Sequence, residues 1–333
     1  MTAHSVRIDN LDATRCGAVN DPSIVIATGH RRSAGSERQN RIGFAKPSAM
    51  IRARRDFVRM GSSPYRGCAA PVRMDVANQL IATETRDAAS GAAPPLPRHT
   101  VRLDSFPRGG VAAVFGASGG IGAALSSALA ETGHFNAILC CSRSSDPAFD
   151  LTDEASVAQA SEAIAAAGEI RLVIIATGML HEGDALPEKS LRELDAERLA
   201  RVFATNATGP ALLMKHLLPI LPRTGKAMLA ALSARVGSIG DNRLGGWYGY
   251  RASKAALNQF VHCAAIELAR RAPEAICVAL HPGTVATKLS APFASASGVA
   301  PVEAARHLLG VIDRLGPQDS GGFYDWRGTP VPW

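Results

Sequence analysis

The stretch VAAVFGASGGIG, residues 111–122, decides the fold. Its apolar first half, 111–115, is typical of a strand buried in a parallel sheet. Three glycines follow at the spacing GxxxGxG, and the run of small residues at 123–130 then predicts a helix. Strand, glycine turn and helix in this order favour phosphate binding, because the turn lets backbone approach the ligand and the helix start offers N–H groups. A plain tight turn is the alternative interpretation.

Beyond this turn, strand and helix patterns alternate to the end of the chain, as in a parallel α/β sheet. We predict a Rossmann-type, doubly wound parallel sheet in a single domain, residues 109–333. Further strands are expected at 136–141, 171–176, 226–232, 275–280 and 322–324, and helices at 154–167, 197–221 (broken near Gly209-Pro210), 248–270 and 301–314.

The segment after the second expected strand is too short for an ordinary crossover. Only seven residues separate Cys141 from Phe149, whereas a helical crossover needs about a dozen. A helix there must be missing or reduced to a turn. A short strand is then expected immediately before Asp150.

Residues 1–108 lack sustained periodicity and carry the positive charge of the chain. They hold 17 Lys and Arg against 9 Asp and Glu, whereas residues 109–333 hold 19 against 20. We expect little stable structure before about Arg108. A disordered extension, a targeting peptide and upstream sequence ahead of an internal start such as Met74 all stay open. Because the segment lacks interleaved aromatic residues, a nucleic-acid partner is not expected.

Composition excludes several classes of protein. The six cysteines form no CxxC pair and no cluster with histidine at metal spacing, so no metal site is expected. Unpaired cysteines of this kind fit a cytoplasmic protein. No apolar run reaches the ~18 residues of a membrane helix. The first 25 residues contain no apolar core of a secretion signal.

The stretch YRASK, residues 250–254, carries the candidate chemistry. On a helix, Tyr250 and Lys254 lie one turn apart on the same face. The ammonium favours the phenolate, which lowers the phenol pKa from about 10 and suits the pair to proton exchange with a carbonyl or hydroxyl group. A surface pair without a function is the alternative for this spacing alone.

Together the glycine turn and the tyrosine–lysine pair resemble the short-chain dehydrogenase/reductase family, from about Val111 onward. Residues 233–239 and 245–254 and the ending GGFYDW at 321–326 are similar to its C-factor-like and sniffer-like carbonyl reductase branch. The resemblance implies a nicotinamide cofactor and hydride transfer to or from a carbonyl carbon. It makes Tyr250 the general acid in reduction and the base in oxidation.

The resemblance also assigns the residues around Tyr250. Lys254 lowers the phenol pKa and binds the nicotinamide ribose, while Asn206 kinks a helix and holds a water beside the lysine. Ser233 is expected to donate a hydrogen bond to the substrate oxygen. The second serine of the usual Ser-Ser-x-x-Gly pattern falls on Ala234, however, so Ser238 or no serine at all stays open.

Arg143, after the second expected strand, favours NADP over NAD, because a guanidinium group binds the 2′-phosphate bidentately. A solvated surface arginine is the alternative. The resemblance places Asp150 and Leu151 at the adenine. Other expected cofactor contacts lie in the glycine turn, after the third strand, in the YRASK stretch and after the fifth strand: Gly116, Ser118, Gly120, Ile121, Gly122, Ala176, Gly178, Tyr250, Lys254, Pro282, Gly283, Val285 and Thr287.

The expected function is NADP-dependent hydride transfer between nicotinamide and a small carbonyl or alcohol substrate. An NADP-binding signalling or sensor protein with little turnover is the alternative. A homo-dimer or homo-tetramer is compatible with the resemblance, and no membrane partner is expected. The loop after Met179, residues 241–247 and a small-residue lid at 288–298 are expected to surround the substrate.

Overall fold

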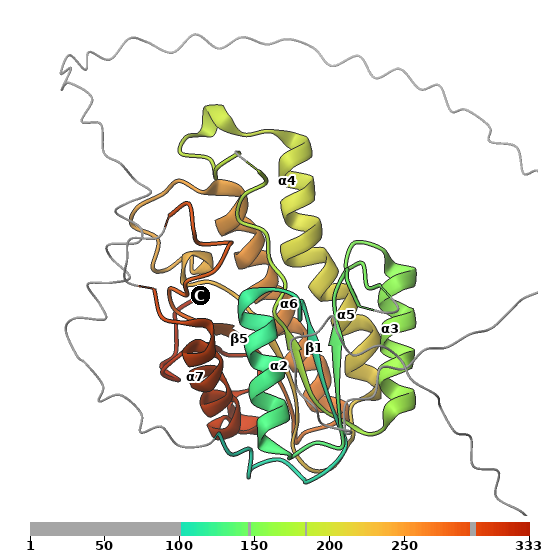
Figure 1. Ribbon diagram of the computed structural model, residues 1–333. Helices are drawn as coiled ribbons and strands as arrows, with labels where there is room; N and C mark the ends of the chain where they lie inside the picture. Colours follow the sequence, from blue (N-terminus) through green and yellow to red (C-terminus); the bar gives the residue numbers. More distant parts are fainter. Residues whose placement is uncertain (1–100, 146–147, 184, 294–297) are drawn as a thin grey trace, which may run out of the picture. The chain divides into compact units, whose positions relative to one another are not determined.

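The computed structural model describes residues 101–145, 148–183, 185–293 and 298–333 (Figure 1). Six strands form one parallel sheet in the order β2-β1-β3-β4-β5-β6. The strands are β1 (Val111–Phe115), β2 (Ala137–Cys141), β3 (Ile170–Ile175), β4 (Ala227–Leu232), β5 (Ala275–His281) and β6 (Phe323–Asp325).

Helices cover both faces of this sheet. They are α2 (Gly120–Thr132), α3 (Glu154–Ala167), α4 (Ala196–Phe203), α5 (Gly209–Leu217), α6 (Tyr248–Arg271) and α7 (Pro301–Arg314). In Figure 1, α2 and α7 lie side by side on one face, while α3, α5 and α6 lie on the other. The arrangement confirms the predicted Rossmann-type fold.

The alternation of side chains along β1 explains the two layers of core. Ala112 and Val114 pack with α2 and α7, whereas Val111, Ala113 and Phe115 pack with α3, α5 and α6. All five are fully buried. A strand buried on both faces cannot show a polar alternation, which is why its sequence is a continuous apolar run.

The expected short strand before Asp150 is a wrong prediction. Residues 142–145 form a turn, and 148–151 contain no strand. The N–H of Phe149 donates to Ser142 O at 2.8 Å, so the chain folds back on the end of β2. The helix α3 then makes the whole crossover to β3.

The folded domain also begins earlier than the expected boundary at Arg108. Leu103 and Phe106 are 1% and 3% exposed and belong to the core beneath α2 and α7. Lys226 holds this segment by donating to Ser105 Oγ at 2.8 Å, with its Nζ 4.5 Å from the Phe106 ring centroid. Two isolated apolar residues carry no periodicity, so the sequence did not reveal them. The rest of the expected disordered extension, 1–100, lies outside the described residues.

No helix in the described ranges combines the length and the apolar composition that crossing a bilayer requires. Across the same ranges, no group of three or more potential metal-binding side chains comes together.

Candidate functional site

The carboxyl ends of the parallel strands bring the predicted site segments to one edge of the sheet. Gly116 follows β1, Ser142 follows β2, Ala176 follows β3, Ser233 follows β4 and Pro282 follows β5. Open parallel sheets bind ligands outside this edge.

The glycine turn is tight, and its glycines let the backbone pack closely on itself. Gly116 adopts φ +83°, and a Cβ on Gly122 would lie 2.2 Å from the Gly116 carbonyl oxygen. The helix α2 begins after Gly119 without a side-chain cap, so its first N–H groups are left for water or an anion. Ser118 is exposed beside them, while Ile121 packs against the core.

These residues fit a dinucleotide. Thr177 Oγ1, after β3, is a buried polar atom without a hydrogen-bond partner among the described residues. Its Cγ2 would lie 3.1 Å from a Cβ on Gly116. Because buried hydroxyl groups normally have a partner, an unpaired one beside the glycine turn suits a polar ligand. The sequence had singled out Ala176 and Gly178 but not Thr177, whose signal was its place between them.

The end of β2 presents Arg143 to solvent, next to Asp150. Both residues are exposed. The pKa of Asp150 is lowered chiefly by hydrogen bonds from the N–H and hydroxyl of Thr152, and Arg143 contributes electrostatically. Leu151, in contrast, turns its side chain into the core, where a Cβ on Gly209 would lie 2.4 Å from its Cγ.

Tyr250 and Lys254 lie together on the buried face of α6. Their residues are 9% and 3% exposed, and Lys254 Nζ lies 5.9 Å from the Tyr250 ring centroid. Lys254 Nζ also donates to Leu232 O, at the end of β4, at 2.8 Å. Burial lowers the pKa of Lys254 to about 8. The expected one-turn pairing of phenol and ammonium is therefore present.

Asn206 connects this pair to the end of β3. It lies in a π-helical turn, Ala204–Thr208, that interrupts the helix between α4 and α5. Its Oδ1 accepts from Met179 N at 2.7 Å, and its Nδ2 donates to Met179 O at 2.8 Å and to Ser253 Oγ at 3.0 Å. Such single-turn π segments are frequent at functional sites.

Two neighbours complete this polar group. Ser253 Oγ donates to Tyr250 O at 2.9 Å, so it links Asn206 to the backbone of the tyrosine. Sequence reasoning missed Ser253, although it lies inside the YRASK stretch. A Cβ on Gly178 would lie 3.6 Å from Lys254 Nζ and 3.7 Å from Asn206 Oδ1, so all three residues meet.

The hydroxyl of Ser233 is engaged by a residue further along α6. It donates to Asn258 Oδ1 at 2.6 Å, and both residues are buried. Asn258 lies eight residues after Tyr250 on α6, about 12 Å along the helix axis. Ala234, the next residue, packs against the apolar cluster that contains Tyr250.

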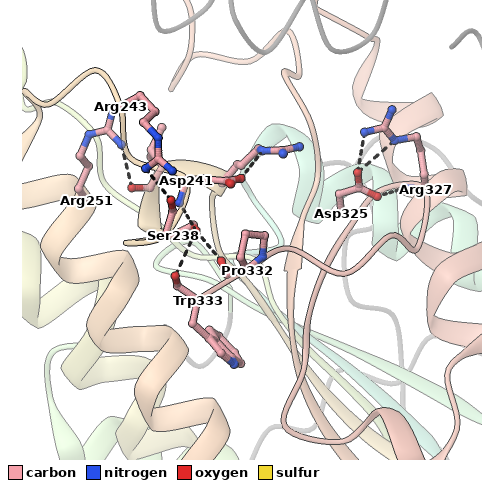
Figure 2. Close-up of polar contacts among 11 residues, drawn as sticks. Ser238, Asp241, Arg243, Arg251, Asp325, Arg327, Pro332 and Trp333 are labelled. Atoms are coloured by element: carbon pink, nitrogen blue, oxygen red, sulfur yellow. Dashed lines mark hydrogen bonds and ion pairs between the residues drawn. The ribbon is translucent and has the colours of Figure 1, made fainter. Parts of the chain in front are cut away.

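Ser238 is engaged with residues near the end of the chain, as Figure 2 shows. Its Oγ donates to Pro332 O and to Trp333 O, and it accepts the N–H of Asp241 at 3.1 Å. Nearby, Arg251 on α6 donates to Val236 O at 3.1 Å. These bonds give Ser238 a role in holding the connection between β4 and α6.

The segment after β5 folds over the glycine turn. A Cβ on Gly120 would lie 2.8 Å from Thr287 Cγ2. Gly283 adopts φ +77° and lies directly against Trp326. Val285 is buried and forms a bridge with Val299, which ties both ends of this loop together.

An apolar cluster surrounds the tyrosine ring. Leu180, Trp247, Tyr250 and Phe293 form it, and the Trp247 ring centroid lies 5.0 Å from that of Phe293 and 6.3 Å from that of Tyr250. These side chains come from the three segments that were expected to surround a substrate. Chemically, the site offers a phenol, a buried amine and an amide group beside a place that fits a dinucleotide.

The chain is similar to known proteins of one family. Residues 110–297 match the family described as short chain dehydrogenase. The chain is 40% identical over 144 residues to C-signal of Myxococcus xanthus. This match covers 43% of the present chain and 84% of C-signal. It is 33% identical over 193 residues to the 1-hydroxy-2-glutathionyl-2-methyl-3-butene dehydrogenase of Rhodococcus sp. strain AD45, covering 56% of this chain and 80% of that protein.

Solved structures include an NADPH-bound carbonyl reductase from chicken fatty liver. It superposes with a TM-score of 0.60 at 26% identity and covers 68% of this chain and 100% of its own. The carbonyl reductase Sniffer of D. melanogaster, at 23% identity and a TM-score of 0.58 over 68% of this chain and 100% of its own, shares the fold.

Proposed function

Because this chain belongs to the short-chain dehydrogenase family of oxidoreductases, we propose that it transfers hydride between NADP and a small carbonyl or alcohol substrate. The observation that carries the proposal is the group formed by Tyr250, Lys254 and Asn206 at the strand ends that hold the glycine turn. A cytoplasmic location is part of the proposal.

When bound, the cofactor supplies or accepts the hydride. Its phosphates would lie at the glycine turn, with Gly116, Ser118, Gly120 and Gly122 around them. The nicotinamide end would contact the segment of Pro282, Gly283, Val285 and Thr287, and the adenine end the segment of Asp150 and Leu151. Ala176, Thr177 and Gly178 would line the route between them.

The protein's own residues move the proton. In reduction, the Tyr250 hydroxyl donates its proton to the substrate oxygen as that oxygen gains charge, and in oxidation the phenolate accepts it. The charged form of Lys254 favours the phenolate. Asn206, bonded to Met179 and Ser253, holds the lysine side of the site in place.

Arg143 supports NADP as the cofactor. It is the exposed cation at the end of β2, and the chicken carbonyl reductase was solved with NADPH. In titrations followed by cofactor fluorescence, we expect NADPH to bind more tightly than NADH. Replacing Arg143 with Ala should raise the Kd for NADPH about 10- to 100-fold, the effect of losing a charge-assisted hydrogen bond. The Kd for NADH should change little.

The matched control for Arg143 is Arg270→Ala, since Arg270 is also exposed but lies at the far end of α6. Equal binding of both cofactors, or equal losses in the two variants, would contradict the assignment of Arg143.

A second candidate function is dinucleotide-dependent signalling with little turnover. It is favoured by the similarity to the protein named C-signal. Screening aldehydes and ketones for NADPH oxidation separates the two candidates. Turnover that requires Tyr250 supports the oxidoreductase, whereas tight NADPH binding without turnover on any carbonyl supports signalling.

From the geometry we propose that Ser233 has a structural role and that position 234, an alanine here, is where a serine would reach the substrate oxygen. Because Ser233 donates to Asn258, and Ala234 packs against the apolar cluster that contains Tyr250, we expect Ser233→Ala to lower the free energy of unfolding by about 1 kcal/mol but to keep kcat within about threefold. Ala234→Ser should increase ketone reduction about 10-fold or more, since one added donor to a developing oxyanion has effects of this order. A loss in Ser233→Ala as large as that in Tyr250→Phe would restore the role expected from the sequence.

A further inference from the structure

We propose that Glu188 is a positioning residue for this reaction: its carboxylate fixes the first turn of α6, and with it the phenol of Tyr250. The inference rests on the proposed function for its catalytic consequence. Its structural part, the hold of Glu188 on α6, stands on the contacts described below.

The first turn of α6 has no side-chain cap of its own. Trp247, the residue before the helix, has φ +51° and is the only non-glycine residue with positive φ in the described part of the chain. Such a conformation costs energy for a residue with a Cβ, and it persists where the surroundings enforce it. The Trp247 side chain makes no capping hydrogen bond to α6. The first N–H groups of the helix therefore need a partner from elsewhere.

Glu188, 61 residues before Gly249 in the sequence, supplies such a partner and also holds the residue before the helix. Its carbonyl oxygen accepts the N–H of Trp247, and its Oε2 accepts the N–H of Gly249 at 3.1 Å. The carboxylate is buried, and its negative charge lies at the positive end of the helix dipole. A Cβ on Gly249 would lie 3.1 Å from Oε1, so the glycine permits this close approach. Tyr250 is the next residue.

The other side of the carboxylate is held by Arg198 on α4. Arg198 Nε lies 3.9 Å from Glu188 Oε1, and the guanidinium group also donates to the carbonyl oxygens of Ala185 and Leu186. The buried charge is thus paired, as buried carboxylates generally are. Both partners of the carboxylate are groups that cannot easily move: a helix backbone and a largely buried arginine.

This arrangement clamps the segment between β3 and α4 at two places. Near its start, Met179 is held by both amide atoms of Asn206. Near its end, Glu188 is held by α6. Between them, Leu180 packs in the same apolar cluster as Tyr250. Glu188 therefore sets the position of the phenol relative to the segment that would face the substrate.

The test compares Glu188→Ala and Glu188→Gln with Glu193→Ala. Glu193 is the matched control, because its Oε2 also accepts a backbone N–H, that of Lys189 at 2.8 Å, but within its own turn. We expect Glu188→Ala to lower kcat about 10- to 100-fold, since a misplacement of 1 Å can cost 10²-fold, while the Kd for NADPH changes less than about twofold. Glu188→Gln keeps an acceptor for Gly249 N–H and should recover kcat to within about fivefold. Glu193→Ala should match the wild type.

Hydrogen exchange gives a readout that needs no substrate. In Glu188→Ala, the amide protons of residues 247–250 should exchange about 10-fold faster, and those of 255–270 at the wild-type rate. Unchanged exchange at 247–250, an unchanged kcat in Glu188→Ala, or an equal loss in Glu193→Ala would overturn the proposal. A wild-type chain that fails to bind NADPH would instead contradict the proposed function, and exchange would still decide whether Glu188 holds α6.

Discussion

We expect Tyr250→Phe to lower kcat for carbonyl reduction by about 10²- to 10⁴-fold, the usual contribution of a positioned general acid, and to leave NADPH binding intact. The substitution removes only the hydroxyl. The Tyr250 ring centroid lies 6.3 Å from that of Trp247 and 5.9 Å from Lys254 Nζ, and a phenylalanine ring can keep both contacts. Cofactor fluorescence measures binding, and NADPH oxidation with an aldehyde measures turnover.

Tyr248→Phe is the matched control for this prediction. Tyr248 lies on the same helix two residues earlier, but the residue four positions after it is Ala252 and not a lysine. One helical turn further on, Tyr248 therefore has no counterpart of the lysine that we propose supports Tyr250 in acid–base chemistry. We expect less than a threefold change in kcat for this variant. Full turnover in Tyr250→Phe, or an equal loss of kcat in both variants, would contradict the role assigned to the Tyr250 phenol.

Lys254→Met should lower kcat/KM about 10²-fold or more, because it removes both the cation beside the phenol and an expected cofactor contact. The same substitution should change how stability depends on pH. Burial lowers the pKa of Lys254 to about 8 in the folded chain, whereas the unfolded chain has an ordinary lysine pKa near 10.4.

The sign of the pH effect follows from proton binding. Between pH 8 and about 10.4, the unfolded lysine still holds a proton that the folded one has lost, so the free energy of unfolding rises with pH across this window. Below pH 8 both forms are protonated, and the cost of burying the charge is fully present. The rise for wild type, relative to Lys254→Met, should be on the order of 1–3 kcal/mol. Urea unfolding at several pH values measures it.

Lys226→Met separates the effect of removing a partly buried lysine on stability from its effect on turnover. Burial also lowers the pKa of Lys226 to about 8, but its Nζ donates to Ser105 Oγ and to the carbonyl oxygens of Ile312 and Asp313, away from Tyr250. This variant should change stability and leave kcat within about twofold at temperatures where it is folded. If the free energy of unfolding of the wild type does not rise above pH 8 relative to that of Lys254→Met, the prediction that burial lowers the pKa of Lys254 is wrong.

Most of the fold could be predicted from local patterns in the sequence. The continuous apolar run at 111–115 and the glycine spacing after it predict a buried strand, a turn and a helix from neighbouring residues alone. The YRASK stretch likewise places Tyr250 and Lys254 on one face, because helix geometry relates residues four positions apart. The structure has both features.

Contacts between segments distant in the sequence were decided only by the tertiary structure. Sequence spacing could not show that Ser233 turns to Asn258, that Leu103 and Phe106 complete the core, or that the described residues just before Asp150 form no strand. Nor could it connect Glu188 to the N–H of Gly249. The physical reason is that periodicity reports which face of an element is buried, whereas the partner of a polar side chain depends on which elements the finished sheet places beside it.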